Sequence, residues 1–160
     1  MNKAIFLDRD GVINHDPGDY TTHISEFTIL PTVMEALKRF QDKGYLLVLI
    51  TNQGGIAKGI YSHEDVAEIH GYFLDECAKH DVQITEIYYS PHHDDFGASL
   101  TRKPGSLMVE KAVARFDIDP TSSVMIGDKQ RDLDAASKVG VPGILVPTNA
   151  PLLEYVELVD

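Results

Sequence analysis

The chain has 160 residues, of which 43% are hydrophobic and 24% charged, and its formal net charge is −11 because 25 acidic residues outnumber 14 basic ones. This size and balance predict a single globular domain over residues 1–160. The acidic excess argues against nucleic acid and anionic membranes as partners, since both bind basic surfaces. A small anionic ligand would therefore need a local cluster of cations.

Cysteine content and hydropathy limit the class of protein further. Cys77 is the only cysteine, so no intramolecular disulfide can form, which suits a reducing compartment. The longest apolar run, residues 45–50, is far shorter than the roughly 20 residues of a membrane helix. Asp8 interrupts the N-terminus before a signal-peptide core forms. We therefore expect a cytoplasmic protein.

Short apolar runs alternate with amphipathic stretches along the whole chain. Strands are predicted over residues 4–7, 45–50, 84–89, 123–126 and 144–146. Helices are predicted over residues 32–43, 62–80, 105–116 and 131–139, with a short last helix after residue 151. Gly44 and Ser62 stand where a helix C-cap and an N-cap belong. The alternation predicts a three-layer α/β fold with a mostly parallel five-strand sheet, whose ligands bind beyond the C-terminal strand ends.

The first predicted strand ends in two acids, Asp8 and Asp10, followed by Gly11. Acids separated by one residue point to the same side of an extended segment. Two carboxylates held so close repel each other unless a cation or a proton joins them. The pair therefore indicates a reactive or metal-binding site, although the same residues also fit a solvated turn.

Phosphate-binding chemistry follows the next two strands. The second strand ends in Thr51 and Asn52 before a Gly-Gly pair, and hydroxyl, amide and free backbone N–H groups suit a phosphate oxygen. Arg102 and Lys103 precede Pro104 after the third strand, and such cations can face an anion. The alternatives are an ordinary glycine-rich loop and a pair of surface charges.

A further carboxylate follows the fourth strand. Asp128 and Lys129 come directly after Gly127, and Asp132 lies one turn later. Asp128 would complete a site for a hard cation with Asp8 and Asp10, since Mg²⁺ prefers oxygen ligands. Asp128 by itself fits an N-cap of the next helix equally well.

The ordered set of these motifs resembles the haloacid dehalogenase-like phosphohydrolases. The matching segments are FLDRDGVIN, LITNQGG, RKP and IGDKQRDLDAA, at residues 6–14, 49–55, 102–104 and 126–136. The chain is most similar to the branch that contains the heptose bisphosphate phosphatases and the histidinol-phosphate phosphatases. The four matching segments, taken in order, span almost the whole chain. The resemblance implies Mg²⁺-dependent hydrolysis of a phosphomonoester through an aspartyl-phosphate.

The resemblance also implies roles for the catalytic and phosphate-binding residues. Asp8 would be the nucleophile, and Asp10 would protonate the leaving oxygen and then activate water. The transferred phosphoryl group would be held by Thr51, Asn52 and Lys103. A carboxylate that attacks a phosphate dianion meets like-charge repulsion, which a cation and Lys103 must offset.

Metal and substrate positions follow from the same resemblance. Mg²⁺ would be held by Asp8, Asp128 and the backbone carbonyl of Asp10, with Lys129 beside it and Asp132 orienting Lys103 or a metal-bound water. The residues expected to face the rest of the substrate are Asp16, Gly18, Tyr20 and Arg102.

One segment departs from the branch, which usually carries a zinc loop with three cysteines. Ser90, Ser99 and Thr101 occupy the thiolate positions here. Hydroxyls are poor zinc ligands beside thiolates, so we expect no structural zinc. Hydrogen bonds or packing must then hold the loop. The polar residues left there, which allow a weak metal site as an alternative, are His92, His93, Asp94 and Asp95.

The chain length leaves no room for an inserted cap domain, so the predicted site is open. The first expected substrate is a heptose bisphosphate and the second is histidinol phosphate. A receiver-type signalling domain uses a similar acid, Mg²⁺, Thr and Lys set, but places its acceptor aspartate after the third strand, whereas Asp8 follows the first. A catalytically silent binding protein is a further alternative. We expect a monomer.

Overall fold

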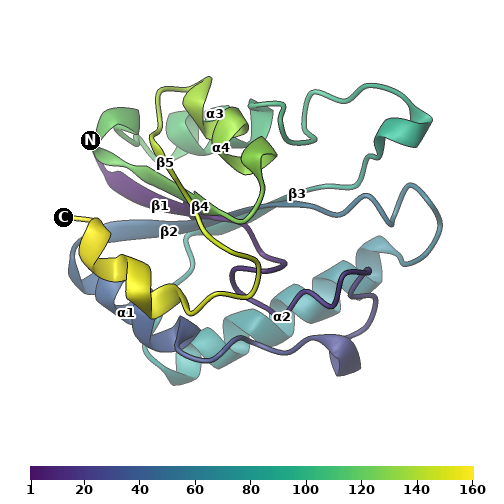
Figure 1. The fold of residues 1–160 in the computed structure, drawn as a ribbon, viewed down its shortest axis with the longest axis horizontal. Helices are drawn as coiled ribbons and strands as arrows, with labels where there is room; N and C mark the ends of the chain where they lie inside the picture. Colours follow the sequence, from purple (N-terminus) through teal and green to yellow (C-terminus); the bar gives the residue numbers. More distant parts are fainter.

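The computed structural model describes all 160 residues and is built on one five-stranded sheet. The strands lie in the order β3-β2-β1-β4-β5, and every neighbouring pair is parallel. Their bounds are β1 Lys3–Leu7, β2 Tyr45–Asn52, β3 Glu86–Ser90, β4 Val124–Gly127 and β5 Gly143–Leu145. Because all the strands run the same way, their C-terminal ends share one edge of the sheet (Figure 1).

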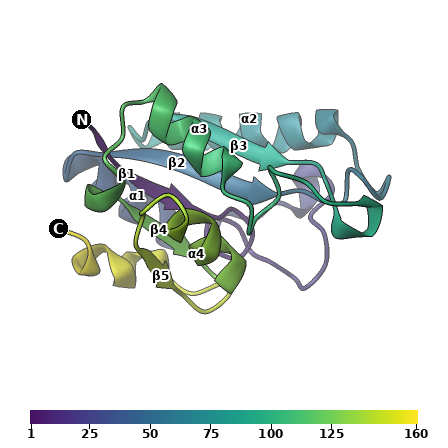
Figure 2. The ribbon, with the colours of Figure 1, turned by 90° about the horizontal axis from the view of Figure 1, so that it is seen from above.

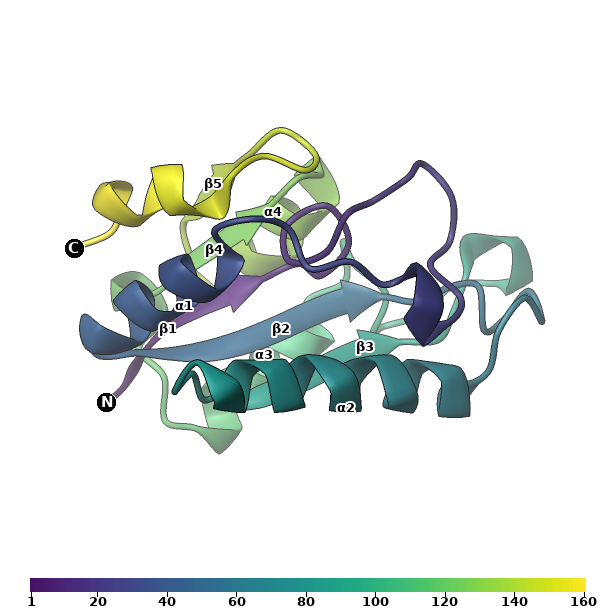
Figure 3. The same ribbon diagram turned by 90° about the horizontal axis from the view of Figure 1, so that it is seen from below.

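Helices cover both faces of this sheet, which gives the three predicted layers. The α-helices are α1 Val33–Asp42, α2 His63–Lys79, α3 Leu107–Arg115 and α4 Gln130–Ser137. Short 3-10 helices span Ile24–Glu26, Asp94–Phe96, Pro120–Ser122 and Leu152–Leu158. The helices α1 and α2 and the C-terminal 3-10 helix lie on one face (Figures 1 and 3). The helices α3 and α4 lie on the other (Figure 2).

The core is divided between the two faces, as the strand pleat requires. In β1, Ile5 and Leu7 enter the larger cluster beneath α1 and α2, whereas Ala4 and Phe6 enter the smaller cluster beneath α3. All four side chains are fully buried. A parallel sheet covered on both faces needs apolar side chains on both, which explains the continuous apolar runs in the sequence.

Local signals set most of the element ends. Ser62 caps α2 through a capping box, since its Oγ accepts from the Asp65 backbone N–H at 3.2 Å and its own N–H donates to the Asp65 carboxylate at 2.9 Å. Gly44 follows α1 with a φ of 89°, which glycine adopts readily. The helix predicted over residues 105–116 is shorter, and the last helix is a 3-10 helix.

The connection between β1 and α1 contains no inserted domain. Between Leu7 and Val33 the only helix is the 3-10 turn Ile24–Glu26. The C-terminal edge of the sheet is therefore bordered by loops (Figure 1). None of the helices combines the length and the apolar character that crossing a membrane requires.

Candidate active site

The sheet order brings the functional loops of the sequence together, because β1 lies between β2 and β4. Asp8 and Asp10 follow β1, Thr51 lies near the end of β2, and Asp128 follows β4. Gly11 has a φ of +86°, and a Cβ there would lie 2.4 Å from Asp128 Oδ2. The two loops approach so closely that only glycine fits at this turn.

Lys103 lies at the centre of this group, with its side chain fully buried. Its Nζ donates to Asp8 Oδ1 at 2.9 Å and to the Ile50 carbonyl at 2.6 Å, and it lies 2.6 Å from Asp132 Oδ1. The side-chain amide of Asn52 holds the Lys103 backbone, accepting from its N–H at 2.9 Å and donating to its carbonyl at 3.1 Å. The ammonium group is therefore fixed against Asp8.

Three carboxylates offer a cluster that fits a divalent cation. One oxygen of each of Asp8, Asp128 and Asp132 lies within 4.8 Å of the others. Asp128 Oδ2 accepts from the Thr148 hydroxyl at 2.8 Å, but Asp128 Oδ1 is buried without any partner. Because a buried carboxylate oxygen without a donor is costly, the cluster fits an oxygen-seeking cation such as Mg²⁺.

The interpretation of Asp128 as a helix N-cap is wrong. The N-cap of α4 is Lys129, whose backbone N–H donates to Asp132 Oδ2 at 3.1 Å. The carboxylate of Asp128 bonds instead to Thr148, which sequence reasoning did not single out. No local motif joins these two residues, because Thr148 follows β5.

The electrostatics of the cluster are consistent with a cation site. Burial raises the pKa of Asp8 well above its ordinary value, the ammonium of Lys103 lowers it, and the charges of Asp132, Asp10 and Asp128 raise it. Burial lowers the pKa of Lys103, but the charges of Asp8 and Asp132 raise it above its ordinary value. A divalent cation beside Asp8 would favour its ionised form.

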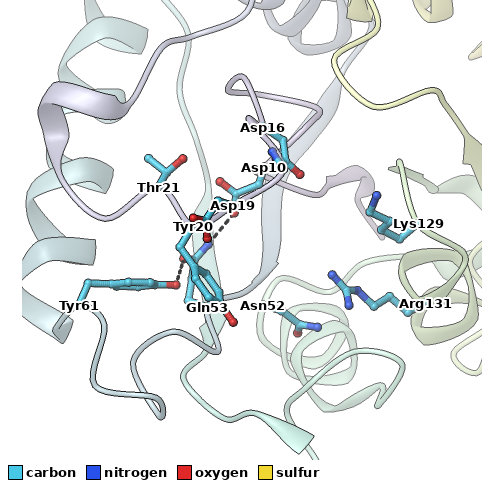
Figure 4. Close-up of a pocket in the computed structure, with 11 residues that line it drawn as sticks. Asp10, Asp16, Asp19, Tyr20, Thr21, Asn52, Gln53, Tyr61, Lys129 and Arg131 are labelled. Carbon is cyan, nitrogen blue, oxygen red and sulfur yellow. Dashed lines mark hydrogen bonds between the residues drawn. The ribbon is translucent and has the colours of Figure 1, made fainter.

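Asp10 is held by a separate set of donors. Its Oδ1 accepts from Arg9 Nη2 at 2.7 Å and from Asn14 Nδ2 at 3.0 Å. Its Oδ2 accepts from Gln53 Nε2 at 2.9 Å (Figure 4). Burial raises the pKa of Asp10, but the charge of Arg9 and these hydrogen bonds lower it below its ordinary value. The backbone carbonyl of Asp10 accepts no hydrogen bond.

Sequence reasoning missed the residues that position Asp10. Arg9 is 1% exposed, although it stands between two functional acids in the sequence. Gln53 accepts from the Tyr61 hydroxyl at 2.7 Å (Figure 4). It also donates to Thr51 Oγ1 at 2.9 Å, and together with its bond to Asp10 this links the ends of β1 and β2. The only sequence signal for Gln53 was its polar side chain, two residues after Thr51 at the end of a predicted strand.

A pocket of about 440 Å³ opens over these strand ends. Its lining residues are Asp10, Asp16, Gly18, Asp19, Tyr20, Thr21, Asn52, Gln53, Tyr61, Lys129 and Arg131 (Figure 4). The predicted substrate-facing residues Asp16, Gly18 and Tyr20 all line it. Arg102 does not line the pocket. Its guanidinium instead donates to the His92 carbonyl at 3.0 Å and pairs with Asp94 at 3.3 Å. Its substrate role stays a prediction.

Hydroxyl groups hold the loop at the three positions where the branch usually carries zinc-binding cysteines. Thr101 Oγ1 lies 2.8 Å from Ser90 Oγ and 3.0 Å from Ser99 Oγ, within hydrogen-bonding distance of both. Ser99 Oγ also accepts from the backbone N–H groups of Thr101 and Arg102, at 3.2 and 3.4 Å. These contacts connect the end of β3 to the segment before Lys103.

We expect the purified protein to contain no stoichiometric zinc, because three hydroxyls that bond one another are poor zinc ligands. Metal analysis of protein prepared without chelators tests this directly. As a matched control, Ser90, Ser99 and Thr101 are replaced together by cysteine and the zinc content is measured again. Zinc at one equivalent in the unmodified protein would contradict the prediction.

Comparison with known proteins places the site in a family. A family model described as HAD-hydrolase-like matches residues 100–154, which include Lys103 and Asp128. The D-glycero-beta-D-manno-heptose-1,7-bisphosphate 7-phosphatase of Haemophilus influenzae is 41% identical over 158 residues, covering 95% of this chain and 85% of the relative. The D-glycero-alpha-D-manno-heptose-1,7-bisphosphate 7-phosphatase of Campylobacter jejuni is 40% identical over 147 residues, covering 92% and 83%.

A solved structure agrees with these relatives. The D,D-heptose 1,7-bisphosphate phosphatase from B. bronchiseptica, complexed with magnesium and phosphate, matches with a TM-score of 0.86 and 31% identity over 98% of this chain and 86% of that one. The chain belongs to the HAD-like hydrolases, in the heptose bisphosphate phosphatase family.

This membership confirms the resemblance seen in the motifs and the fold. The HAD-like protein is a phosphatase, so the receiver-type and the silent binding interpretations are set aside. The position of Asp8 after β1 agrees with this choice. The expected monomer stays a prediction.

Proposed function

We propose that the enzyme removes the 7-phosphate of a D-glycero-D-manno-heptose 1,7-bisphosphate. The observation that carries the catalytic part is the buried ammonium of Lys103 between Asp8 and Asp132, beside the unpartnered oxygen of Asp128. The names of relatives about 40% identical over nearly the whole chain support the substrate. The site is open, so substrate contacts come from loops rather than from an enclosing cap.

Asp8 acts as the nucleophile in this proposal. Its side chain is 12% exposed, and its Oδ1 is held by Lys103 at 2.9 Å, which leaves Oδ2 free to attack phosphorus. The bond between Asp8 Oδ2 and phosphorus forms as the bond to the sugar oxygen breaks. Water then cleaves the aspartyl-phosphate and restores the carboxylate.

Asp10 serves as the acid and then as the base. Three N–H donors from Arg9 and Asn14 occupy its Oδ1, whereas its Oδ2 accepts one hydrogen bond, from Gln53, and Asp10 lines the pocket. A phosphate dianion bound beside Asp10 would raise its pKa, so Oδ2 can carry the proton that it gives to the leaving sugar oxygen, and it later takes one from the attacking water. Arg9 and Asn14 fix the orientation of the carboxylate in both steps.

Mg²⁺ fits the acidic cluster and would be held by Asp8, Asp128 and the free backbone carbonyl of Asp10. When bound, it supplies charge neutralisation and polarises phosphoryl oxygens. Asp132 pairs with Lys103 and receives the Lys129 N–H, so it positions its neighbours. A test of this assignment is calorimetric Mg²⁺ binding to Asp128→Asn, which is expected to be weaker than to the unmodified protein.

The phosphoryl group is oriented by Thr51 and Lys103. Thr51 is fully buried at the end of β2, and its hydroxyl is oriented by Gln53. Both polar atoms of the Asn52 amide bond the Lys103 backbone, so Asn52 acts by positioning Lys103. Fixed donors around the transferred group provide most of the catalysis in phosphoryl transfer.

Asp10→Asn is expected to lower kcat by about 10²- to 10⁴-fold, because the leaving oxygen loses its proton donor. The amide oxygen of the variant can still accept from Arg9 and Asn14 at the Oδ1 position, so we expect folding to be retained, although the hydrogen bond from Gln53 is lost. Steady-state kinetics measure the loss of turnover, and circular dichroism measures whether the fold is retained. Turnover within tenfold of the unmodified enzyme would contradict the acid/base role.

A panel of phosphate esters tests the substrate. The unmodified enzyme with Mg²⁺ is assayed on both anomers of the heptose 1,7-bisphosphate, on heptose 7-phosphate and on histidinol phosphate. The highest kcat/KM is expected for a heptose bisphosphate, and the relatives of both anomeric types leave the preferred anomer to the assay. A higher value for histidinol phosphate, or equally low values for all, would refute the proposed substrate.

A further inference from the structure

We propose that His70, in the middle of α2, is a positioning residue for the reaction. It fixes the guanidinium of Arg9 and, through that group, holds the carboxylate of Asp10 where it protonates the leaving oxygen. The inference rests on the proposed function, in which Asp10 is the acid. His70 itself contacts neither the substrate nor the metal, so it acts only through Arg9.

Arg9 is a buried cation whose guanidinium has one partner at each end. Its Nε and Nη2 donate to Asp10 Oδ1 at 3.3 and 2.7 Å, and its Nη1 lies 3.2 Å from His70 Nε2. The guanidinium also lies 5.8 Å from the centre of the Phe27 ring. His70 is the only hydrogen-bond partner of Nη1. Because a guanidinium is a rigid plane, fixing Nη1 also fixes the direction in which Nη2 meets Asp10.

The imidazole of His70 can only be the acceptor in this contact. A guanidinium has donors and no acceptor, so His70 Nε2 must be unprotonated and the ring must be neutral. Burial and the charge of Arg9 lower the pKa of His70 to about 3, against a smaller opposing effect of Asp10. The imidazole therefore remains an acceptor for Arg9 at neutral pH.

The ring of His70 is itself held in place by its surroundings. Tyr89 of β3 meets it edge-on, with ring centroids 5.9 Å apart and an interplanar angle of 69°. The Tyr89 hydroxyl lies 2.8 Å from Nδ1 of His63, in the first turn of α2. The helix α2 runs along one face of the sheet (Figure 3). The acid that follows β1 is thus connected through Arg9 to a packed helix.

The orientation of Asp10 matters most when the leaving group needs a proton. As the bond between phosphorus and an alkyl oxygen breaks, both bonding electrons stay on that oxygen, which takes the proton of Asp10. An aryl oxygen such as p-nitrophenolate is stable as an anion and leaves without the proton. Loss of the His70 contact should therefore slow alkyl esters selectively, whereas a general loss of packing would slow both kinds of ester alike.

The test compares kcat/KM for the alkyl phosphate that ranks highest in the substrate panel with kcat/KM for p-nitrophenyl phosphate, both with Mg²⁺. This parameter includes the steps up to departure of the leaving group and excludes hydrolysis of the aspartyl-phosphate. His70→Leu has a similar size but no acceptor, and should lower the alkyl-to-aryl ratio about 10-fold, a part of what acid catalysis contributes.

Two further variants act as controls, and thermal unfolding of each variant measures stability separately. His70→Gln carries an oxygen that can accept from Arg9 Nη1, so it should restore most of the ratio. His80→Leu makes the same change at an exposed position after α2 and should keep the ratio. His70→Ala, which also lacks an acceptor, gives the same comparison if His70→Leu does not fold.

Asp10→Asn separates this inference from the proposed function, because it should lower the alkyl-to-aryl ratio more than His70→Leu does. If Asp10→Asn leaves the ratio unchanged, Asp10 is not the acid, and both the proposed role of Asp10 and this inference fail. If Asp10→Asn lowers the ratio and His70→Leu does not, the inference alone is overturned. An equal loss of the ratio in His70→Gln and His70→Leu also overturns it, since the acceptor would then be irrelevant.

Discussion

Replacing Asp8 with asparagine is expected to lower kcat for phosphate release by at least about 10³-fold, because an amide cannot attack phosphorus as a carboxylate does. The change removes one negative charge from a buried cluster that also contains Asp128 and Asp132. The variant without metal should therefore be at least as stable as the unmodified protein. Kinetics and thermal unfolding in EDTA measure the two effects.

The control for Asp8→Asn replaces a different aspartate, outside the candidate site, with asparagine. Asp134→Asn alters a carboxylate on α4 whose one hydrogen-bond partner is the Gln130 amide of the same helix. It should retain near-normal turnover. A rapid-quench search for covalently bound phosphate gives a second measurement, with label expected on the unmodified enzyme and none on Asp8→Asn. Wild-type turnover in Asp8→Asn would rule out Asp8 as the nucleophile.

Lys103→Met is expected to destabilise the protein by about 3–5 kcal/mol at pH 8 in EDTA, since removing one partner of a buried ion pair leaves uncompensated charge. The ammonium it removes contacts Asp8, Asp132 and the Ile50 carbonyl. Activity should also fall by about 10²-fold or more, because the phosphoryl group loses a fixed positive charge. Chemical denaturation measures the loss of stability.

The pH dependence of Lys103→Met has a definite sign. Without the ammonium, which lowers the pKa of Asp8, burial and the neighbouring carboxylates raise that pKa further. The folded variant then binds protons that the unfolded chain releases, so its stability falls as pH rises. Its deficit should be smaller at pH 5 than at pH 8. Lys111→Met, which changes an exposed lysine of α3, is the matched control and should shift stability by less than about 0.5 kcal/mol at either pH. A deficit independent of pH would contradict this account.

The fold could be predicted because each element carries its own local signals. The apolar run of β2 and the capping residues Ser62 and Gly44 are visible without any tertiary information. Element ends were less predictable. The strand expected over residues 84–89 begins at Glu86, where its pairing with Val48 of β2 begins. Pairing between distant strands sets this boundary, and local sequence does not contain it.

The residues of the candidate site were also predictable where local motifs mark them and not where long-range contacts define them. The residue types at the strand ends, from Asp8 to Asp128, indicated a phosphoryl-transfer site because each lies in a recognisable motif. Gln53, Thr148 and His70 were missed, because what distinguishes them is the group they contact. A long-range contact between side chains has no signature in the spacing of residues.

The sequence alone was sufficient for the chemistry of this protein, because the carboxylates, the lysine and the strands that carry them are identified by residue type and period. Only the tertiary structure decided which of these charged groups pair with one another. It paired Lys103 with Asp8 and Asp132 and left an oxygen of Asp128 without a donor. The physical reason is that electrostatic interactions depend on distance and burial, and both are set when separate strand ends meet at one edge of the sheet.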